Sequence, residues 1–328
     1  MAPIRSALRT PCCRPGYNKP NKSGENLCRF GMEEKMLNPR FFRKFAPFIT
    51  GAFILYTILL IIPILLSFAY SFTNWDGYSP TVEMVGWKNY IKIFQSESML
   101  SALKNSFVFC FFNAVVITLL AIPLSLVFNA GFRSRNFVRS AFFFASVPSV
   151  LIIGYIFQLF FGPTENGVIN SIIGRLGLEP VRWLSRGVLP MFSVIFANVW
   201  RLTGWHACIY LARLQGIPEE YYEAAKIDGA SGKNLFRYIT FPLLAPAMTI
   251  STMLIVIDGL KIYALPYSLT GGGPGYKTTF MTQLIIKTGI GEKMVGRSSA
   301  MAVVFFAVIM AVSLVQLYFS RKREDDVC

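Results

Sequence analysis

Charged residues are scarce in this sequence. Only 15% of its 328 residues are Asp, Glu, Lys or Arg, whereas 54% are hydrophobic. Soluble domains carry about 25% charged residues, so the composition excludes an ordinary soluble domain and indicates a chain that lies in lipid. The length allows several membrane spans, but not those spans together with a large catalytic domain.

Groups for metal, nucleotide or covalent chemistry are also missing. His206 is the only histidine, which excludes a metal site built on two, and the six cysteines have neither metal-site nor disulfide spacing. A phosphate loop needs Gly directly before its Lys, but Tyr276 precedes Lys277 in the glycine-rich stretch 271–278. We interpret that stretch as a flexible turn. The sequence predicts no catalytic residues, no metal, no cofactor and no nucleotide site.

The sequence has instead long apolar runs. A membrane helix needs about 20 apolar residues, and six stretches qualify, with Pro123 and Pro148 inside the second and third. The predicted fold class is an all-α integral membrane protein with six transmembrane helices. The expected spans are 47–72, 103–129, 139–161, 188–212, 243–266 and 300–320.

The ends of the chain flank this expected membrane domain of residues 47–320. Residues 1–46 are polar and basic without apolar periodicity, which is typical of a disordered arm. Met32 and Met36 lie just before the first span, so translation can start at either of them instead of Met1. Residues 321–328 form the expected tail.

Lys and Arg placement predicts the orientation. With the N-terminus inside, the segments 1–46, 130–138, 213–242 and 321–328 hold nineteen Lys and Arg residues, and the opposite loops hold nine. Cytoplasmic loops carry the excess of positive charge. We therefore expect both termini in the cytoplasm, and we read the net charge of +15 as a mark of membrane topology rather than of nucleic-acid binding.

The stretch 217–246 is a polar interruption between the fourth and fifth expected spans. Pro218 suits the first position of a helix, Gly229 suits its left-handed end, and Ser231 suits the cap of a second helix, which Pro242 would bound. The pattern predicts a helix-turn-helix hairpin on the cytoplasmic side.

This hairpin carries a recognisable spacing. Glu223-Ala224-Ala225 is followed after three residues by Gly229, after nine more by Ile239, and then by Pro242. The pattern resembles the EAA loop of binding-protein-dependent ABC importer permeases, with Phe241 where that family has Leu. Stretches such as Leu269–Pro274 and Trp75-Asp76-Gly77 are similar to the sugar-transporting subgroup of these permeases.

The resemblance implies a function and a set of partners. The chain would be a permease of the prokaryotic cytoplasmic (inner) membrane that forms half of the pathway of a sugar importer. Its partners would be ATPase subunits, a second homologous permease and a periplasmic or lipid-anchored solute-binding protein, with no nucleic acid. The residues expected to couple to the ATPase are Glu223, Ala224, Ala225, Asp228, Gly229, Ala230, Phe236, Ile239 and Pro242.

Polar residues inside the expected spans are candidates for the solute path. Such groups are costly in lipid and indicate a pathway or a structural pairing. Asp258 and Lys261 are three residues apart, close enough for a structural ion pair on one helix face, and we favour that interpretation over a direct role in transport. The full set of candidates is Arg201, Trp205, Asp258, Lys261 and Tyr263.

Other functions remain open at this level. Arg201, Asp258 and Lys261 can also serve an ion-coupled secondary transporter or a channel, although the sequence lacks inverted repeats with paired broken helices. A permease of the same kind for a non-sugar solute is a further alternative. A membrane-embedded enzyme ranks last because no nucleophilic or metal-binding set is present.

Overall fold

The computed structural model describes residues 39–162 and 167–325, and nearly all of their regular structure is helical. In this part of the chain the only β-type pairing is an isolated bridge between Thr73 and Met84. The expected arm of residues 1–46 lies largely outside the described residues. The chain divides into two units, residues 1–66 and 67–328.

The first unit ends in one long apolar helix. It comprises α3 (Pro39–Tyr56), a π-helical turn η2 (Thr57–Ile61) and the start of α4 (Ile62–Tyr70). The helix therefore begins before residue 47, where the apolar run starts. Its membrane-length part, Ile49–Tyr70, contains no buried residue, and most of its side chains are exposed.

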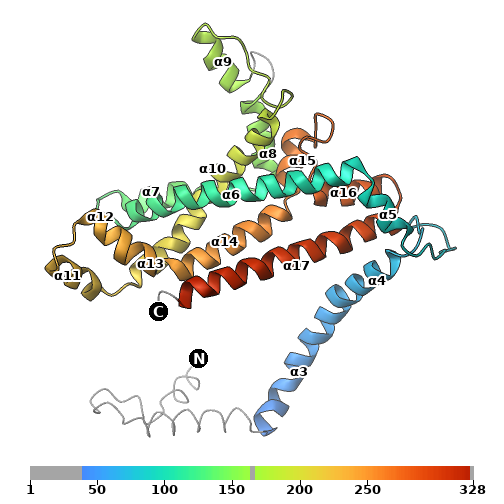
Figure 1. Cartoon of the computed structure of the whole chain (residues 1–328), viewed down its shortest axis with the longest axis horizontal. Helices are drawn as coiled ribbons and strands as arrows, with labels where there is room; N and C mark the ends of the chain where they lie inside the picture. Colours follow the sequence, from blue (N-terminus) through green and yellow to red (C-terminus); the bar gives the residue numbers. More distant parts are fainter. Residues whose placement is uncertain (1–38, 163–166, 326–328) are drawn as a thin grey trace. The chain divides into compact units, whose positions relative to one another are not determined.

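The second unit is a bundle of helices (Figure 1). Its elements, in chain order, are α5 (Lys88–Phe94), α6 (Glu97–Asn129), α7 (Arg135–Phe144), α8 (Val150–Phe160), α9 (Val168–Arg175), α10 (Leu189–Gln215), α11 (Glu219–Ile227), α12 (Gly232–Leu235), η3 (Phe236–Thr240), α13 (Phe241–Leu243), α14 (Ala245–Leu260), α15 (Ala264–Thr270), α16 (Met281–Ile286), η4 (Lys287–Gly291) and α17 (Val295–Asp325).

Three described helices are long and apolar enough to cross a membrane: Ile49–Tyr70, Glu97–Asn129 and Val295–Lys322. A fourth candidate is the pair Gly232–Leu243 and Ala245–Leu260, which is bent by 63° at its break. The expected third span is divided between α7 and α8, with Pro148 in the break. Pro123, in contrast, lies inside an unbroken α6. The strict count is thus lower than the six expected spans.

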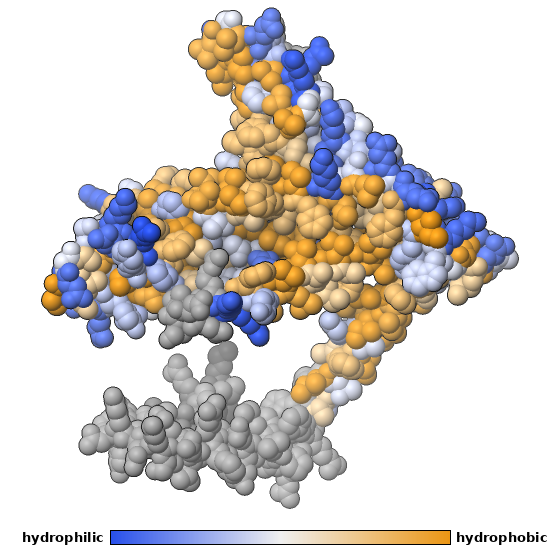
Figure 2. Space-filling view, in the orientation of Figure 1, coloured by the Kyte–Doolittle hydropathy of each residue, from blue (hydrophilic) through white to orange (hydrophobic). Residues whose placement is uncertain are grey.

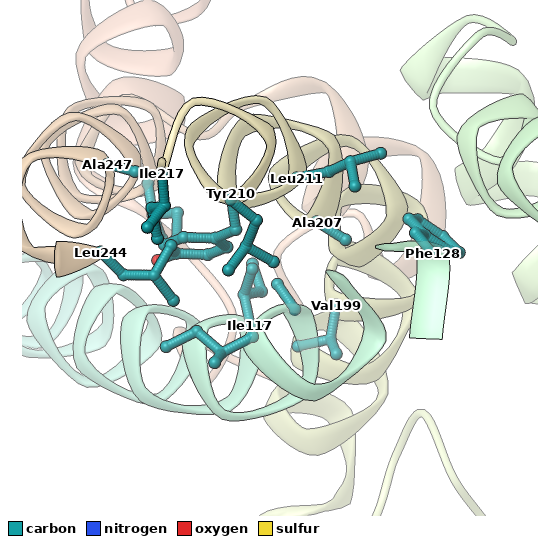
Figure 3. Close-up of a cluster of buried hydrophobic side chains, with 13 residues drawn as sticks. Ile117, Phe128, Val199, Ala207, Tyr210, Leu211, Ile217, Leu244 and Ala247 are labelled. Atoms are coloured by element: carbon teal, nitrogen blue, oxygen red, sulfur yellow. The ribbon is translucent and has the colours of Figure 1, made fainter. Parts of the chain in front are cut away.

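α6 is the centre of the second unit. It packs against both α10 and α14, and α14 packs in turn against α17. The largest buried cluster joins these helices to the hairpin. In Figure 3 Tyr210 of α10 lies between Ile117 of α6 and Leu244 at the start of α14. Association of helices in lipid depends on such close packing, because lipid tails are as apolar as the side chains.

The outer surface of the bundle has hydrophobic and hydrophilic regions. Figure 2 shows hydrophobic side chains over the middle of the second unit. Hydrophilic ones gather at the end that carries α11 and α12, and on the other side from α9 toward α5. Large apolar side chains such as Leu119, Leu159 and Phe319 are more than 60% exposed on this surface. Exposure on this scale fits lipid rather than water.

A glycine allows α7 to approach α10 closely. Gly204 of α10 is buried, and a Cβ atom there would collide with the backbone carbonyl of Phe142 in α7. Small residues at membrane helix interfaces permit this kind of backbone contact.

We predict that Gly204→Val destabilises the bundle by about 1–3 kcal/mol, the usual cost of overpacking. Thermal unfolding of the detergent-solubilised protein measures the effect. Gly174→Ala is the matched control, because Gly174 is an exposed helical glycine with open space around it. Equal melting temperatures for Gly204→Val and the wild type would contradict the close contact.

Candidate coupling hairpin and solute path

The segment between α10 and α14 forms two helices joined by a tight turn. Gly229 has φ +80°, its N–H donates to the Lys226 carbonyl, and the Ala230 N–H donates to the Ala225 carbonyl. This bonding is the Schellman ending of a helix, which favours glycine at its left-handed position. The glycine therefore sets the direction in which the second helix leaves.

Three of the expected caps differ in detail. Pro218 is the capping residue before α11 rather than its first helical residue, and Ser231 caps α12 without a side-chain hydrogen bond. Pro242 does not bound the second helix, because α12 continues through η3 and α13 to Leu243. Pro242 therefore lies inside a continuous helical stretch and has no N–H for the Tyr238 carbonyl. The π-helical turn η3 lies directly before it, and there the Phe241 N–H donates to the Phe236 carbonyl, a local adjustment of the kind that accommodates proline within a helix.

The expected coupling residues divide into an exposed group and a packed group. Glu223, Ala224, Asp228 and Gly229 are exposed. Phe236 packs against the buried cluster, and the Tyr222 hydroxyl lies 3.2 Å from Thr240 Oγ1, which ties α11 to η3. The remaining members, Ala225, Ala230, Ile239 and Pro242, are half-buried. The packed group fixes the shape of the hairpin, and the exposed group is free to contact a partner.

Sequence reasoning missed three exposed apolar side chains on the hairpin. Ile227 is 86% exposed, and Tyr221 and Tyr238 are also largely exposed. Ile227 lies four residues after Glu223 and therefore shares its helix face. The signal was present in the sequence as an isoleucine and tyrosines within an otherwise polar stretch.

The hairpin meets the membrane helices at the 63° bend before Ala245. Pro246 has no N–H, so the Pro242 carbonyl has no helical donor four residues on. Next to it, Arg213 of α10 donates from Nε to the Leu243 carbonyl at 2.9 Å. Arg213 thus fastens the end of α10 to the bend.

Arg201 is held by a chain of amides across two helices. Its guanidinium donates to Asn198 Oδ1 at 3.1 Å, and the Asn198 amide donates to Asn113 Oδ1 of α6 at 2.9 Å. Both asparagines are at most 4% exposed. Neither was among the sequence candidates, although an asparagine within an apolar run was a usable signal because polar groups there need partners.

The other path candidates lie on α10, on α14 or just beyond α14. Trp205 is half-buried beside His206, whose Nδ1 lies 2.9 Å from Ser251 Oγ of α14. Tyr263 is half-buried and stacks on Tyr267.

Asp258 and Lys261 are both exposed, and they make no ion pair with each other. The favoured structural pair is therefore not formed. Lys261 caps the end of α14, and its N–H still donates to the Ile257 carbonyl. The spacing of three residues therefore permits an ion pair, but two exposed side chains need not form it.

A separate groove of about 980 Å³ runs between α6 and α10. Its lining is apolar apart from Lys104, Asn105 and Lys277, and it contains none of the five path candidates. The glycine-rich loop adjoins it. Asn105 donates to the Tyr276 and Thr279 carbonyls, and Thr278 is buried, so this loop is anchored to α6 rather than hanging free.

The loop that holds Trp75-Asp76-Gly77 is fastened to the start of α17. The Gly296 N–H donates to the Trp75 carbonyl at 2.8 Å. The Asp76 carboxylate accepts hydrogen bonds from the backbone N–H groups of Ser79 and Tyr78, and these bonds, the first above all, hold the pKa of Asp76 below its ordinary value. The motif has a structural role in this loop.

A family model decides the identity. Residues 117–325 match the model described as "Binding-protein-dependent transport system inner membrane component". The chain belongs to this family. The match includes the hairpin, the amide chain from Asn198 to Arg201, and all of α14.

Individual relatives agree with the family. The permease is 30% identical over 85% of its length to "Probable starch degradation products transport system permease protein AmyD" of Thermoanaerobacterium thermosulfurigenes, of which it covers 94%. It is 30% identical over 82% of its length to "Trehalose/maltose transport system permease protein MalF" of Thermococcus litoralis, of which it covers 90%.

A solved structure shares the fold of the permease. It is titled "Crystal structure of bacterial alginate ABC transporter in complex with alginate pentasaccharide-bound periplasmic protein", with a TM-score of 0.76 and 21% identity, and the match covers 87% of the permease and 96% of that chain. This likeness concerns the fold; the family and the relatives identify the chain as a multi-pass membrane permease subunit of a transport system.

We predict that Arg213→Met frees the bend of the permease. Hydrogen bonds to charged groups contribute about 1.5–3 kcal/mol, so amides of residues 241–248 should exchange their hydrogens roughly 10- to 100-fold faster. Hydrogen–deuterium exchange with mass spectrometry measures the rates. Arg237→Met is the control, because Arg237 lies over the Tyr238 ring and donates no hydrogen bond. Unchanged exchange in Arg213→Met would remove Arg213 from this role.

Proposed function

We propose that this permease forms half of the translocation pathway of an ATP-driven importer for a sugar or sugar-like solute. Its hairpin, residues 217–242, receives the motion of a separate ATPase subunit. A second, homologous permease forms the other half of the pathway, and a periplasmic or lipid-anchored binding protein delivers the solute. The chain itself hydrolyses nothing.

The observation that carries this proposal is the exposed face of α11. Glu223, Ala224 and Ile227 lie on it, and Ile227 is 86% exposed. An isoleucine this open is out of place on a polar surface unless a partner covers it. Ala224 lets that partner approach the helix backbone, and Glu223 supplies a charge for a basic group beside it.

The hairpin is also packed firmly against the membrane helices, so its motion is transmitted to them. The packed residues Ile217 and Phe236 belong to the cluster that contains Tyr210, and Arg213 fastens the bend. A displacement of α11 is therefore passed to α10 and α14 together. Those two helices carry the path candidates Arg201, Trp205 and Asp258, with Lys261 and Tyr263 directly after α14.

The solute class rests on the relatives. Two of them are named for uptake of starch products and of trehalose or maltose, and the shared fold includes a transporter of alginate. Polar and aromatic groups such as Arg201 and Trp205 suit carbohydrates, which offer hydroxyl oxygens for hydrogen bonds and flat faces for stacking.

The membrane arrangement follows from the same proposal. The six apolar stretches cross the cytoplasmic (inner) membrane, with the third span made of α7 and α8 and the fifth bent at residue 244. Both termini and the hairpin then lie in the cytoplasm, where the ATPase is, and α9 lies outside with the binding protein.

We predict that Glu223→Lys leaves membrane insertion intact and separates ATP hydrolysis from uptake. Losing a buried partner of a charge pair costs about 2–5 kcal/mol, so uptake should fall more than roughly tenfold. Transport and ATPase assays on the assembled complex in proteoliposomes measure both rates. Asn234→Lys is the control, since Asn234 is exposed on α12 of the same hairpin. Wild-type uptake in Glu223→Lys would refute the coupling role.

We also predict that Gly229→Pro uncouples the complex, whereas Gly229→Asn does so much less. Proline fixes φ near −65° and cannot adopt the φ of +80° found here, but asparagine tolerates the left-handed region. The same two assays apply. If the proline variant transported at the wild-type rate, the direction of the second helix would be irrelevant to function.

A further inference from the structure

Arg201 has an unfinished set of hydrogen bonds. Its Nε is buried and donates to nothing, and the guanidinium makes only the bond to Asn198. At membrane depth an unsatisfied donor is expensive, because no bulk water can replace the missing partner. This arrangement favours a state of the permease in which Arg201 has a better partner.

Among the carboxylates of the described residues, Asp258 of α14 is the one that interacts electrostatically with Arg201. The two side chains nevertheless make no ion pair, and Asp258 is exposed and unpaired in the described part of the chain. The other charged or titratable group that interacts with Arg201 is His206 on the same helix, which is engaged by Ser251. The Asp258 carboxylate and the Arg201 guanidinium thus interact electrostatically without forming an ion pair.

The two groups belong to the helices that the hairpin connects. Arg201 is on α10, which leads into α11, and Asp258 is on α14, which follows the bend. A displacement of the hairpin reaches α10 through Ile217 and α14 through the bend. Any difference between the displacements of the two helices changes the separation of the two side chains. Asn198, in contrast, is on the same helix as Arg201 and remains within reach whatever α14 does.

We propose that Arg201 exchanges partners during transport, bonding Asn198 in one state and forming an ion pair with Asp258 in the other. Asn113 holds Asn198 in place and so keeps the first partner ready. Each state of the membrane helices is then stabilised by a different bond of Arg201. This proposal rests on the proposed function, because the motion of the hairpin drives the exchange.

The test is a pair of double-mutant cycles on the assembled transporter, read as melting temperatures without nucleotide and with ATP plus vanadate. One cycle combines Arg201→Gln with Asp258→Asn, and the other combines Arg201→Gln with Asn198→Leu. We expect the Arg201–Asp258 cycle to be non-additive by several degrees in one nucleotide state only. The Arg201–Asn198 cycle should be non-additive only in the other. Lys261→Gln with Arg201→Gln is the control and should be additive in both states.

Additivity of the Arg201–Asp258 cycle in both states, or equal coupling in both, overturns the exchange. If Arg201→Gln fails to assemble, Asn198→Asp provides the second measurement. A carboxylate there should hold Arg201 on α10 and abolish the melting shift caused by ATP and vanadate, and a normal shift would also overturn the proposal. Glu223→Lys distinguishes a failure of the partner exchange from a failure of the proposed function. If both Asn198→Asp and Glu223→Lys leave the melting shift unchanged, the coupling role of the hairpin fails. If Glu223→Lys removes the shift and Asn198→Asp does not, only the partner exchange fails.

Discussion

The structure depends on one constraint, which is that polar groups at membrane depth must find partners within the protein. The amide chain of Asn113, Asn198 and Arg201 meets it across α6 and α10, and His206 with Ser251 meets it across α10 and α14. These hydrogen bonds specify which helices pack together, because lipid tails are as apolar as the side chains and apolar burial alone favours no particular partner helix. The same constraint makes the buried Arg201 Nε informative, since it is one of the buried polar atoms in the described part of the chain that have no hydrogen-bond partner.

The hairpin joins this interior to a partner outside the membrane. Its outer side exposes Glu223 and Ile227 on α11, and its inner side packs against the core around Tyr210. Arg213 and the bend at residue 244 lie between the two. Because the hairpin is fastened on both sides, movement at α11 reaches the helices that carry Arg201 and Asp258 rather than being absorbed in a flexible loop.

Much of this could be predicted from the sequence, where local chemistry decides the structure. Gly229 sets the turn because only a residue that tolerates positive φ ends a helix in that way. Apolar length gave the main helices, but not the 63° bend, which arises where Pro246 removes a donor and Arg213 supplies another. The Asp258–Lys261 pair was wrong because a spacing of three residues permits an ion pair but does not impose one on two exposed side chains. Asn113 and Asn198 were missed because their hydrogen bond joins two helices and two residues that lie 85 positions apart in the sequence.

The central claim is that the exposed face of α11 is the contact through which an ATPase moves the permease. A photo-crosslinking amino acid at position 227 tests it most directly, in membranes that contain the complete transporter. The account predicts a covalent product with the ATPase subunit whose yield changes between the nucleotide-free and the ATP–vanadate states. A crosslinker at position 227 that captures only lipid, or nothing, in both states would contradict it.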